Sequence, residues 1–223
     1  MKISGSFHYI ELTLNIRIIK LMIQTDKPIS SSGYGIAIIS AQLFHEQCKE
    51  HKIRSKKMLS YFDKNPPLFY EFAAKGAFIP ISHIHSYYYQ VFFTIGDNRQ
   101  TLEQWDLVPT KETFCLEIKD GALWVVSFEQ LEAWNYKDLE ECTAIETYYY
   151  LTYEGEKQIA YKAAKYPIAN GKYKVNIIGL RKKEVEKEEK FREGYAFLLQ
   201  LEKVATLPNT DDASQLDFSE LFA

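Results

Sequence analysis

The residues of this sequence best suited to chemistry are His83 and His85, one residue apart in the stretch SHIHS. They open an aromatic-rich run that is typical of a β-strand from about 83 to 95. Because side chains alternate along a strand, both imidazoles would lie on one face, where they could bind one metal ion. Tyr87 and Tyr89 share that face. We therefore favour a partly buried aromatic strand face and predict no metal and no cofactor.

The same stretch resembles the first motif of the cupin family, which has a glycine, His-x-His, an acidic ligand and a closing glycine. The corresponding residues here are Gly76, His83, His85, Gln90 and Gly96. The resemblance implies a metal-dependent enzyme that uses His83 and His85. A glutamine stands in place of the usual carboxylate, and no histidine follows position 85 as a downstream ligand. A cupin-like enzyme is therefore the alternative to the main prediction.

Other catalytic patterns are absent from the sequence. Cys48 lies three residues from both His45 and His51, but no third group that would orient a base is evident. The stretch Gly33-Tyr34-Gly35 lacks both the third glycine of a dinucleotide fingerprint and the Gly-Lys-Ser/Thr of a P-loop. The sequence thus predicts no catalytic residue and favours a protein that is not an enzyme.

The stretch SFEQLEAWNYKDLEEC differs from these motifs because it surrounds two aromatic residues with acids. Aromatic anchors ringed by charge are typical of an interface with a protein partner of opposite charge. We predict that this patch binds a basic protein through Glu129, Glu132, Trp134, Tyr136, Asp138, Glu140 and Glu141. Packing of Trp134 into the core, with the acids solvated, would explain the same pattern.

Charge is unevenly distributed along the chain. The net charge is −3, yet residues 101–150 contain three lysines against eleven acids. The run KEHKIRSKK at 49–57 is basic and could contact phosphates, but a solvated helix end explains it equally. A mildly acidic chain with one such run makes nucleic acid an improbable partner.

The compartment is indicated by the cysteines and the N-terminal stretch. Cys48, Cys115 and Cys142 are widely spaced and form no CxxC pair, which favours a reducing cytoplasm. Charged residues interrupt the apolar N-terminal stretch, so we expect neither a signal peptide nor a membrane helix.

The elements that must position these residues are mostly strands. Alternation of apolar and polar residues predicts a strand at 9–19, and short apolar runs predict others at 36–39, 144–153, 158–166, 172–180 and 194–204. The pair Asp120-Gly121 between two apolar runs predicts a β-hairpin over 111–127. Ser40 is expected to begin a helix to about His51, and Ser127 and Gln130 form a capping box.

These elements predict a mainly β fold, with α+β as a variant: an antiparallel β-sandwich with two or three short helices. We expect residues 1–205 to form a single domain with a helical insertion near 40–76. Residues 206–223 carry four acids and no base. We expect them to form a mobile acidic tail that docks, if at all, through Phe218, Leu221 and Phe222.

The closing strands carry a second resemblance. The stretch YPIANGKYKVNIIGL, with Pro167, Gly171, Tyr173 and Val175, is similar to small bacterial β-sandwich inhibitors such as the competence-system nuclease inhibitor and toxin-immunity proteins. The resemblance implies a non-enzymatic protein that sequesters another protein. The sequence thus favours an immunity or inhibitor protein against a basic nuclease-type toxin; a structural or assembly protein is a further alternative.

Overall fold

A computed structural model of the chain describes residues 21–24, 27–31, 33–95, 102–151, 155, 157–187, 189–212, 216, 218, 221 and 222. The strand predicted at 9–19 lies outside these residues. The described strands are β1 Leu21–Gln24, β2 Ile29–Ser30, β3 Gly35–Ile39, β4 Phe78–Ser82, β5 Tyr88–Ile95, β6 Trp105–Ile118, β7 Ala122–Ser127, β8 Ala144–Leu151, β9 Lys157–Pro167, β10 Gly171–Lys182 and β11 Tyr195–Val204.

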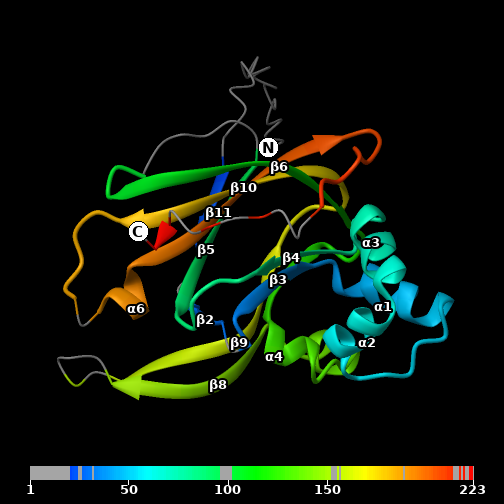
Figure 1. Cartoon of the computed structure of the whole chain (residues 1–223), viewed down its shortest axis with the longest axis horizontal. Coiled ribbons are helices and arrows are strands. Elements are labelled where there is room, and N and C mark those ends of the chain that lie inside the picture. Colours follow the sequence, from blue (N-terminus) through cyan, green and yellow to red (C-terminus); the bar gives the residue numbers. More distant parts are fainter. Residues whose placement is uncertain are drawn as a thin grey trace, which may run out of the picture.

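The helices are α1 Ala41–Glu50, α2 Met58–Lys64, α3 Pro66–Ala74, α4 Phe128–Leu131, α5 Tyr136–Glu140 and α6 Lys190–Glu193. Most of the helices cover one side of this strand framework, whereas α6 lies on the other side, next to β5 and β11 (Figure 1). The prediction of a mainly β protein is confirmed. The described residues contain six helices rather than two or three, because α2 and α3 are separated at Asn65 and because α4, α5 and α6 are only four or five residues long.

The strands form one 11-stranded sheet in the order β4-β3-β7-β9-β2-β5-β11-β10-β6, with β1 added to β5 and β8 added to β9. Most neighbours are antiparallel, but β11 pairs with β5, and β2 with β9, in parallel. The two ends of the path approach each other, since the N–H of Glu117 in β6 donates to the carbonyl of Gly76, just before β4, at 2.9 Å. The sheet is therefore mixed and nearly closed.

The hairpin predicted over 111–127 is wrong, although both of its strands exist. β6 pairs with β10, whereas β7 pairs with β3 and β9. The chain bends at Gly121, whose φ is +71°, and the bend lies beside a second one at 168–170, where the Asn170 side chain accepts from the Gly121 N–H at 2.6 Å. Asp120-Gly121 thus forms a corner at which two paired strands pass together from one part of the sheet to the other.

Two other strand predictions have different outcomes. β8 and β9 are antiparallel neighbours, as the short connection between them predicts. The strand expected from about 83 to 95 is wrong in its first part, because residues 83–87 connect β4 to β5 and His83 has a φ of +58°. The strand begins only at Tyr88.

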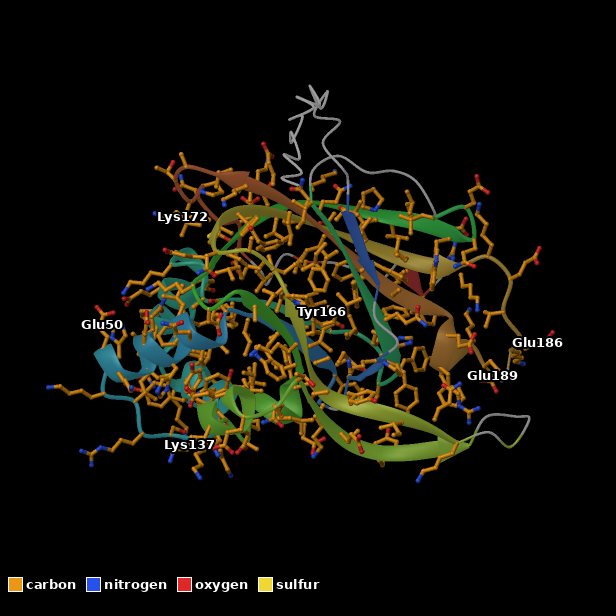
Figure 2. The ribbon with its side chains drawn as sticks, turned by 180° about the vertical axis from the view of Figure 1, so that it is seen from behind. Glu50, Lys137, Tyr166, Lys172, Glu186 and Glu189 are labelled. Atoms are coloured by element: carbon orange, nitrogen blue, oxygen red, sulfur yellow. The ribbon has the colours of Figure 1, made fainter. Side chains whose placement is uncertain are left out.

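The interior consists of a large core enclosed by the sheet and a second core beneath the helices. Tyr166 lies inside the first core, while Glu50, Lys137 and Glu186 project outward (Figure 2). In the second core the rings of Phe44, Phe62, Phe72 and Phe78 pack at 5.2–6.2 Å, mostly edge to face. Such contacts between aromatic rings stabilise the docking of α1, α2 and α3 on β4.

The described part of the C-terminal segment lies on the sheet. Leu216, Phe218 and Leu221 are buried in the large core, and Phe222 packs against it. The ring of Phe218 lies 5.0 Å from that of Phe197 in β11. Among the described helices none is both long and apolar enough to cross a membrane.

Candidate functional site

The predicted acidic and aromatic patch lies where β7 leaves the sheet and the chain forms α4 and α5. Ser127 begins α4 as predicted, and its hydroxyl accepts from the Gln130 N–H at 3.2 Å. This bond satisfies one of the free N–H groups at the start of the helix. The patch is thereby fixed against the second core, beside α1.

The side chain of Trp134 packs in the second core and does not protrude as an anchor for a partner. Only 6% of its surface is exposed, and its ring centroid lies 4.7 Å from that of Phe44. Its backbone N–H donates to the carbonyl of Lys56 at 2.8 Å. The segment before α2 and the segment before α5 are therefore held together at this residue.

Two of the predicted acids have partners within the protein. Glu129 forms an ion pair with Lys162 of β9. Glu132 accepts from both the N–H and the hydroxyl of Ser60 in α2, each at 2.8 Å. These carboxylates hold α4 to its neighbours, so they are less available to a binding partner.

The remaining predicted residues lie on or next to α5. Tyr136 stacks on His45 of α1, with centroids 4.3 Å apart and planes 5° from parallel. Asp138, Glu140 and Glu141 are exposed. Asp138 accepts from the Asn135 side chain at 2.7 Å, whereas no hydrogen bond or ion pair to another described residue satisfies the carboxylates of Glu140 and Glu141.

Burial and neighbouring charges keep the stacked rings uncharged. Burial lowers the pKa of His45, and the positive charge of Lys49 lowers it further. Burial raises the pKa of Tyr136, and the carboxylate of Glu140 adds to this effect. Near neutral pH the pair is thus a neutral imidazole against a neutral phenol, which forms a flat aromatic surface between charged side chains.

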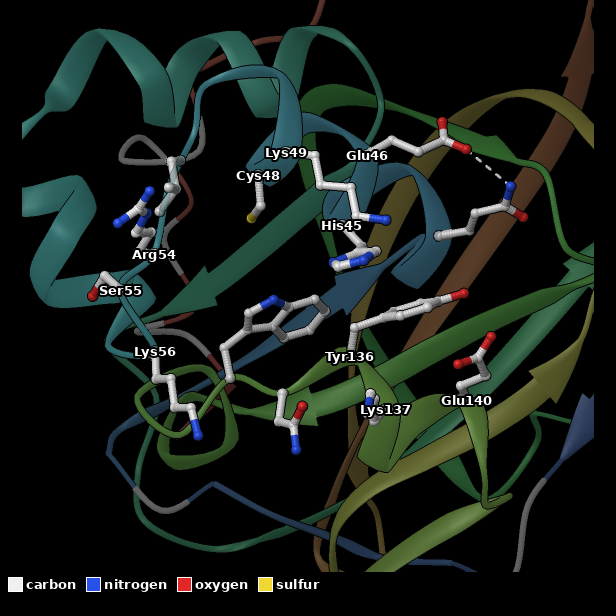
Figure 3. A pocket seen from close by; sticks show the side chains of 14 residues that line it. His45, Glu46, Cys48, Lys49, Arg54, Ser55, Lys56, Tyr136, Lys137 and Glu140 are labelled. Carbon is white, nitrogen blue, oxygen red and sulfur yellow. Dashed lines mark hydrogen bonds between the residues drawn. The ribbon is translucent and has the colours of Figure 1, made fainter.

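An open groove of about 780 Å³ lies between α1 and α5 (Figure 3). Tyr136, Trp134 and Glu140 line it from the predicted patch. The opposite wall belongs to α1 and the segment that follows it, whose cations Lys49, Arg54 and Lys56 also line the groove. We call this feature the α1–α5 groove.

The sequence did not predict that the basic run and the acidic patch would meet. Lys49, Arg54 and Lys56 belong to the run 49–57, and Lys137 of α5 faces the same groove. These two stretches are about 80 residues apart in the chain. Their opposite net charges were the one signal that could have suggested their proximity.

The other candidate residues do not form a reactive site. Cys48 lines the groove but is buried, and burial raises the pKa of its thiol to about 12. His51 points instead to Glu71, with Nε2 and Oε1 3.0 Å apart. The thiol therefore lacks both a lowered pKa and a histidine partner.

His83 and His85 do not share a strand face. Both are exposed in the connection between β4 and β5. His83 lies 3.1 Å from the Ser82 hydroxyl, and His85 stacks on Phe222 with centroids 4.0 Å apart. Within the described part of the chain, no three His, Cys, Asp or Glu side chains are grouped as metal ligands would be.

Comparisons with known proteins give matches only among solved structures. No family model and no curated protein matches the sequence. ComJ of Bacillus subtilis, an inhibitor of the DNA-degrading activity of NucA, matches with a TM-score of 0.40 and 8% identity, over 82% of this chain and 99% of ComJ. A crocagin biosynthetic protein, gene J, matches with a TM-score of 0.34 and 10% identity, over 81% of this chain and 97% of its own. ComJ is an inhibitor of the class that the closing strands resemble.

Proposed function

We propose that this protein binds and inhibits a basic protein partner of the nuclease class, and that α5 is its principal contact. The proposal rests chiefly on one observation: Asp138, Glu140 and Glu141 are exposed together beside the half-buried ring of Tyr136. Exposed carboxylates around an aromatic ring suit a partner that presents lysine and arginine. The class of partner follows from the resemblance of the closing strands.

The division among the predicted acids sharpens the proposal. Glu129 and Glu132 have intramolecular partners, so breaking those contacts would cost stability before it affected binding. Among the described residues Glu140 and Glu141 have no such partner, and Asp138 accepts only from the neighbouring Asn135 side chain, so changing these acids should cost less stability. Complementary charge at α5 would speed encounter with a basic partner, and Tyr136 would slow its release.

The experiment begins with capture of the partner from the native cell and purification of the complex. Amide hydrogen exchange is then compared between the free protein and the complex. We expect protection to be concentrated at 135–141, because α5 is only five residues long and its amides exchange readily when it is free. If protection falls elsewhere and 135–141 is unchanged, α5 is not the contact surface. If the captured protein has no nuclease activity that this protein lowers, the inhibitor assignment is wrong.

A further inference from the structure

The α1–α5 groove has opposite charges at its two ends. Arg54 and Lys56 lie at one end, and Glu46 and Glu140 at the other (Figure 3). The carboxylate of Glu46 accepts from Lys119 at 2.7 Å, a contact that lowers the pKa of Glu46. Neither Arg54 nor Lys56 has a side-chain hydrogen bond or ion pair to another described residue. The uncompensated charge of the groove is therefore mainly positive.

The wall of the groove also carries an unused hydrogen-bond donor. Trp134 lines the groove with 94% of its surface buried, and no described residue accepts from its indole N–H. Its backbone N–H is already occupied by the carbonyl of Lys56. The indole nitrogen itself is not fully buried, so its N–H is accessible from the groove, where an acceptor oxygen of a ligand can reach it.

We propose that the α1–α5 groove binds an extended acidic segment of a protein partner. Its carboxylates would contact Arg54 and Lys56, a carbonyl or carboxylate oxygen would accept from the Trp134 indole, and a neutral or basic side chain would lie toward Glu140. The inference rests on the proposed function only in taking a protein as the ligand. A partner that bound both α5 and the α1–α5 groove would present a basic surface to α5 and an acidic segment to the groove.

The charge pattern favours a peptide over a nucleic acid. A nucleic acid carries a negative charge at every phosphate and would be repelled where Glu140 borders the groove. Single-stranded nucleic acid also needs aromatic faces on which its bases can stack. His45 and Tyr136 are stacked on each other, so one face of each ring is taken. A peptide can carry acids only where the groove is positive.

The test uses a defined probe, N-acetyl octaglutamate amide, titrated into the full-length ¹⁵N-labelled protein at low ionic strength. The protein has three tryptophans, so it gives three indole N–H signals in the spectrum, and Trp134→Phe identifies the relevant one. We expect the Trp134 signal to move downfield, as for a donor that gains an acceptor. The signals of Trp105 and Trp124 should not move, because neither residue lines the groove; Trp105 belongs to another cluster, and Trp124 is buried in the cluster that also contains Trp134.

Two matched double variants locate the binding site. Arg54→Glu with Lys56→Glu should weaken octaglutamate binding at least tenfold. Lys111→Glu with Lys187→Glu makes the same change in net charge at exposed positions outside the groove, and should weaken binding less than twofold. Melting curves confirm that both variants are folded.

Three results would overturn the inference: no movement of the Trp134 signal at millimolar octaglutamate, an equal loss of affinity in both double variants, or tighter binding of oligo(dT)₈ than of octaglutamate in the groove. None of them bears on α5. If the peptide test fails while reversal of the α5 charges still abolishes binding of the captured partner, the proposed function stands without the groove.

Discussion

At the scale of single residues, Trp134 and Tyr136 show what a sequence cannot separate. Both are aromatic residues among acids, and the sequence predicts the same binding role for them, with packing of Trp134 into the core as the alternative. Trp134 packs on Phe44 in the core, whereas Tyr136 covers His45 at the surface. The difference depends on where α1 docks, which is decided by contacts with residues some 90 positions earlier. Local pattern carries no information about such contacts.

The three cysteines should differ in reactivity. Cys48 and Cys115 are buried, and burial raises their pKa values to about 12 and about 11. Roughly one Cys48 in ten thousand is then a thiolate at pH 8. Cys142 is only partly buried. We expect one thiol per folded chain to react quickly with Ellman's reagent, and Cys142→Ser to abolish that phase.

The control for this measurement is the unfolded chain in guanidinium chloride, in which all three thiols should react. Fast reaction of a second thiol in the folded protein would show that Cys48 or Cys115 is not buried as the structure has it.

At the scale of elements, strands were predictable and their pairing was not. The apolar runs on both sides of Asp120-Gly121 form β6 and β7, and the bend lies where the turn residues predict it. A hairpin and a corner require the same residues there. The corner forms because the chain bends a second time at 168–170, between β9 and β10. β6 therefore pairs with β10 and β7 with β9, instead of β6 pairing with β7. The strand predicted over the histidine stretch is wrong for a different reason: the positive φ of His83 is incompatible with a continuous strand.

Two glycines with the same backbone conformation should respond differently to alanine. Gly121 has a φ of +71°, and a Cβ there would meet only the Asn170 side chain at 4.0 Å. Gly76 has a φ of +73°, but its Cβ would lie 2.8 Å from the backbone nitrogen of Glu117. Gly121→Ala should cost about 1 kcal/mol of unfolding free energy, the price of the left-handed conformation alone.

Gly76→Ala should cost at least twice as much, because it also pushes apart the two strands that nearly close the sheet. Urea denaturation of both variants measures the difference. Equal losses, or a larger loss at Gly121, would contradict the close approach of Gly76 to β6.

At the scale of the whole molecule, the alternating and apolar runs predicted a mainly β protein but not its near closure. Closure depends on the contact of Gly76, just before β4, with Glu117 of β6, about 40 positions later in the chain. The candidate site also depends on contacts between residues that are distant in the sequence. The acidic patch was identified as a linear stretch, while the groove arises because the basic run from the α1–α2 connection lies against it. A surface that combines segments distant in the sequence can be identified only when the fold is known.

The C-terminal segment should contribute to stability. Leu216, Phe218 and Leu221 are buried, and a Cβ added at Gly179 of β10 would lie 3.2 Å from both Phe218 and Leu221. A chain that ends at Asp212 would expose this apolar surface. Loss of these side chains should cost about 3 kcal/mol or more, which lowers the melting temperature by roughly 6 °C or more in a chain of this size. A change below about 2 °C would show that the segment is not part of the core.

The central claim is that α5 binds a basic partner through its carboxylates, and the association rate with the captured partner tests it most directly. Stopped-flow measurements at several salt concentrations compare the wild type with Asp138→Lys, Glu140→Lys and Glu141→Lys combined. The control combines Glu184→Lys, Glu186→Lys and Glu202→Lys, which makes the same charge change at exposed acids elsewhere.

We predict that the α5 variant associates at least tenfold more slowly at low salt and loses most of its salt dependence, because like charges now meet in the encounter. The control should remain within twofold of the wild type. A folded α5 variant that associates as fast as the wild type, and inhibits the partner equally, would contradict the proposed function.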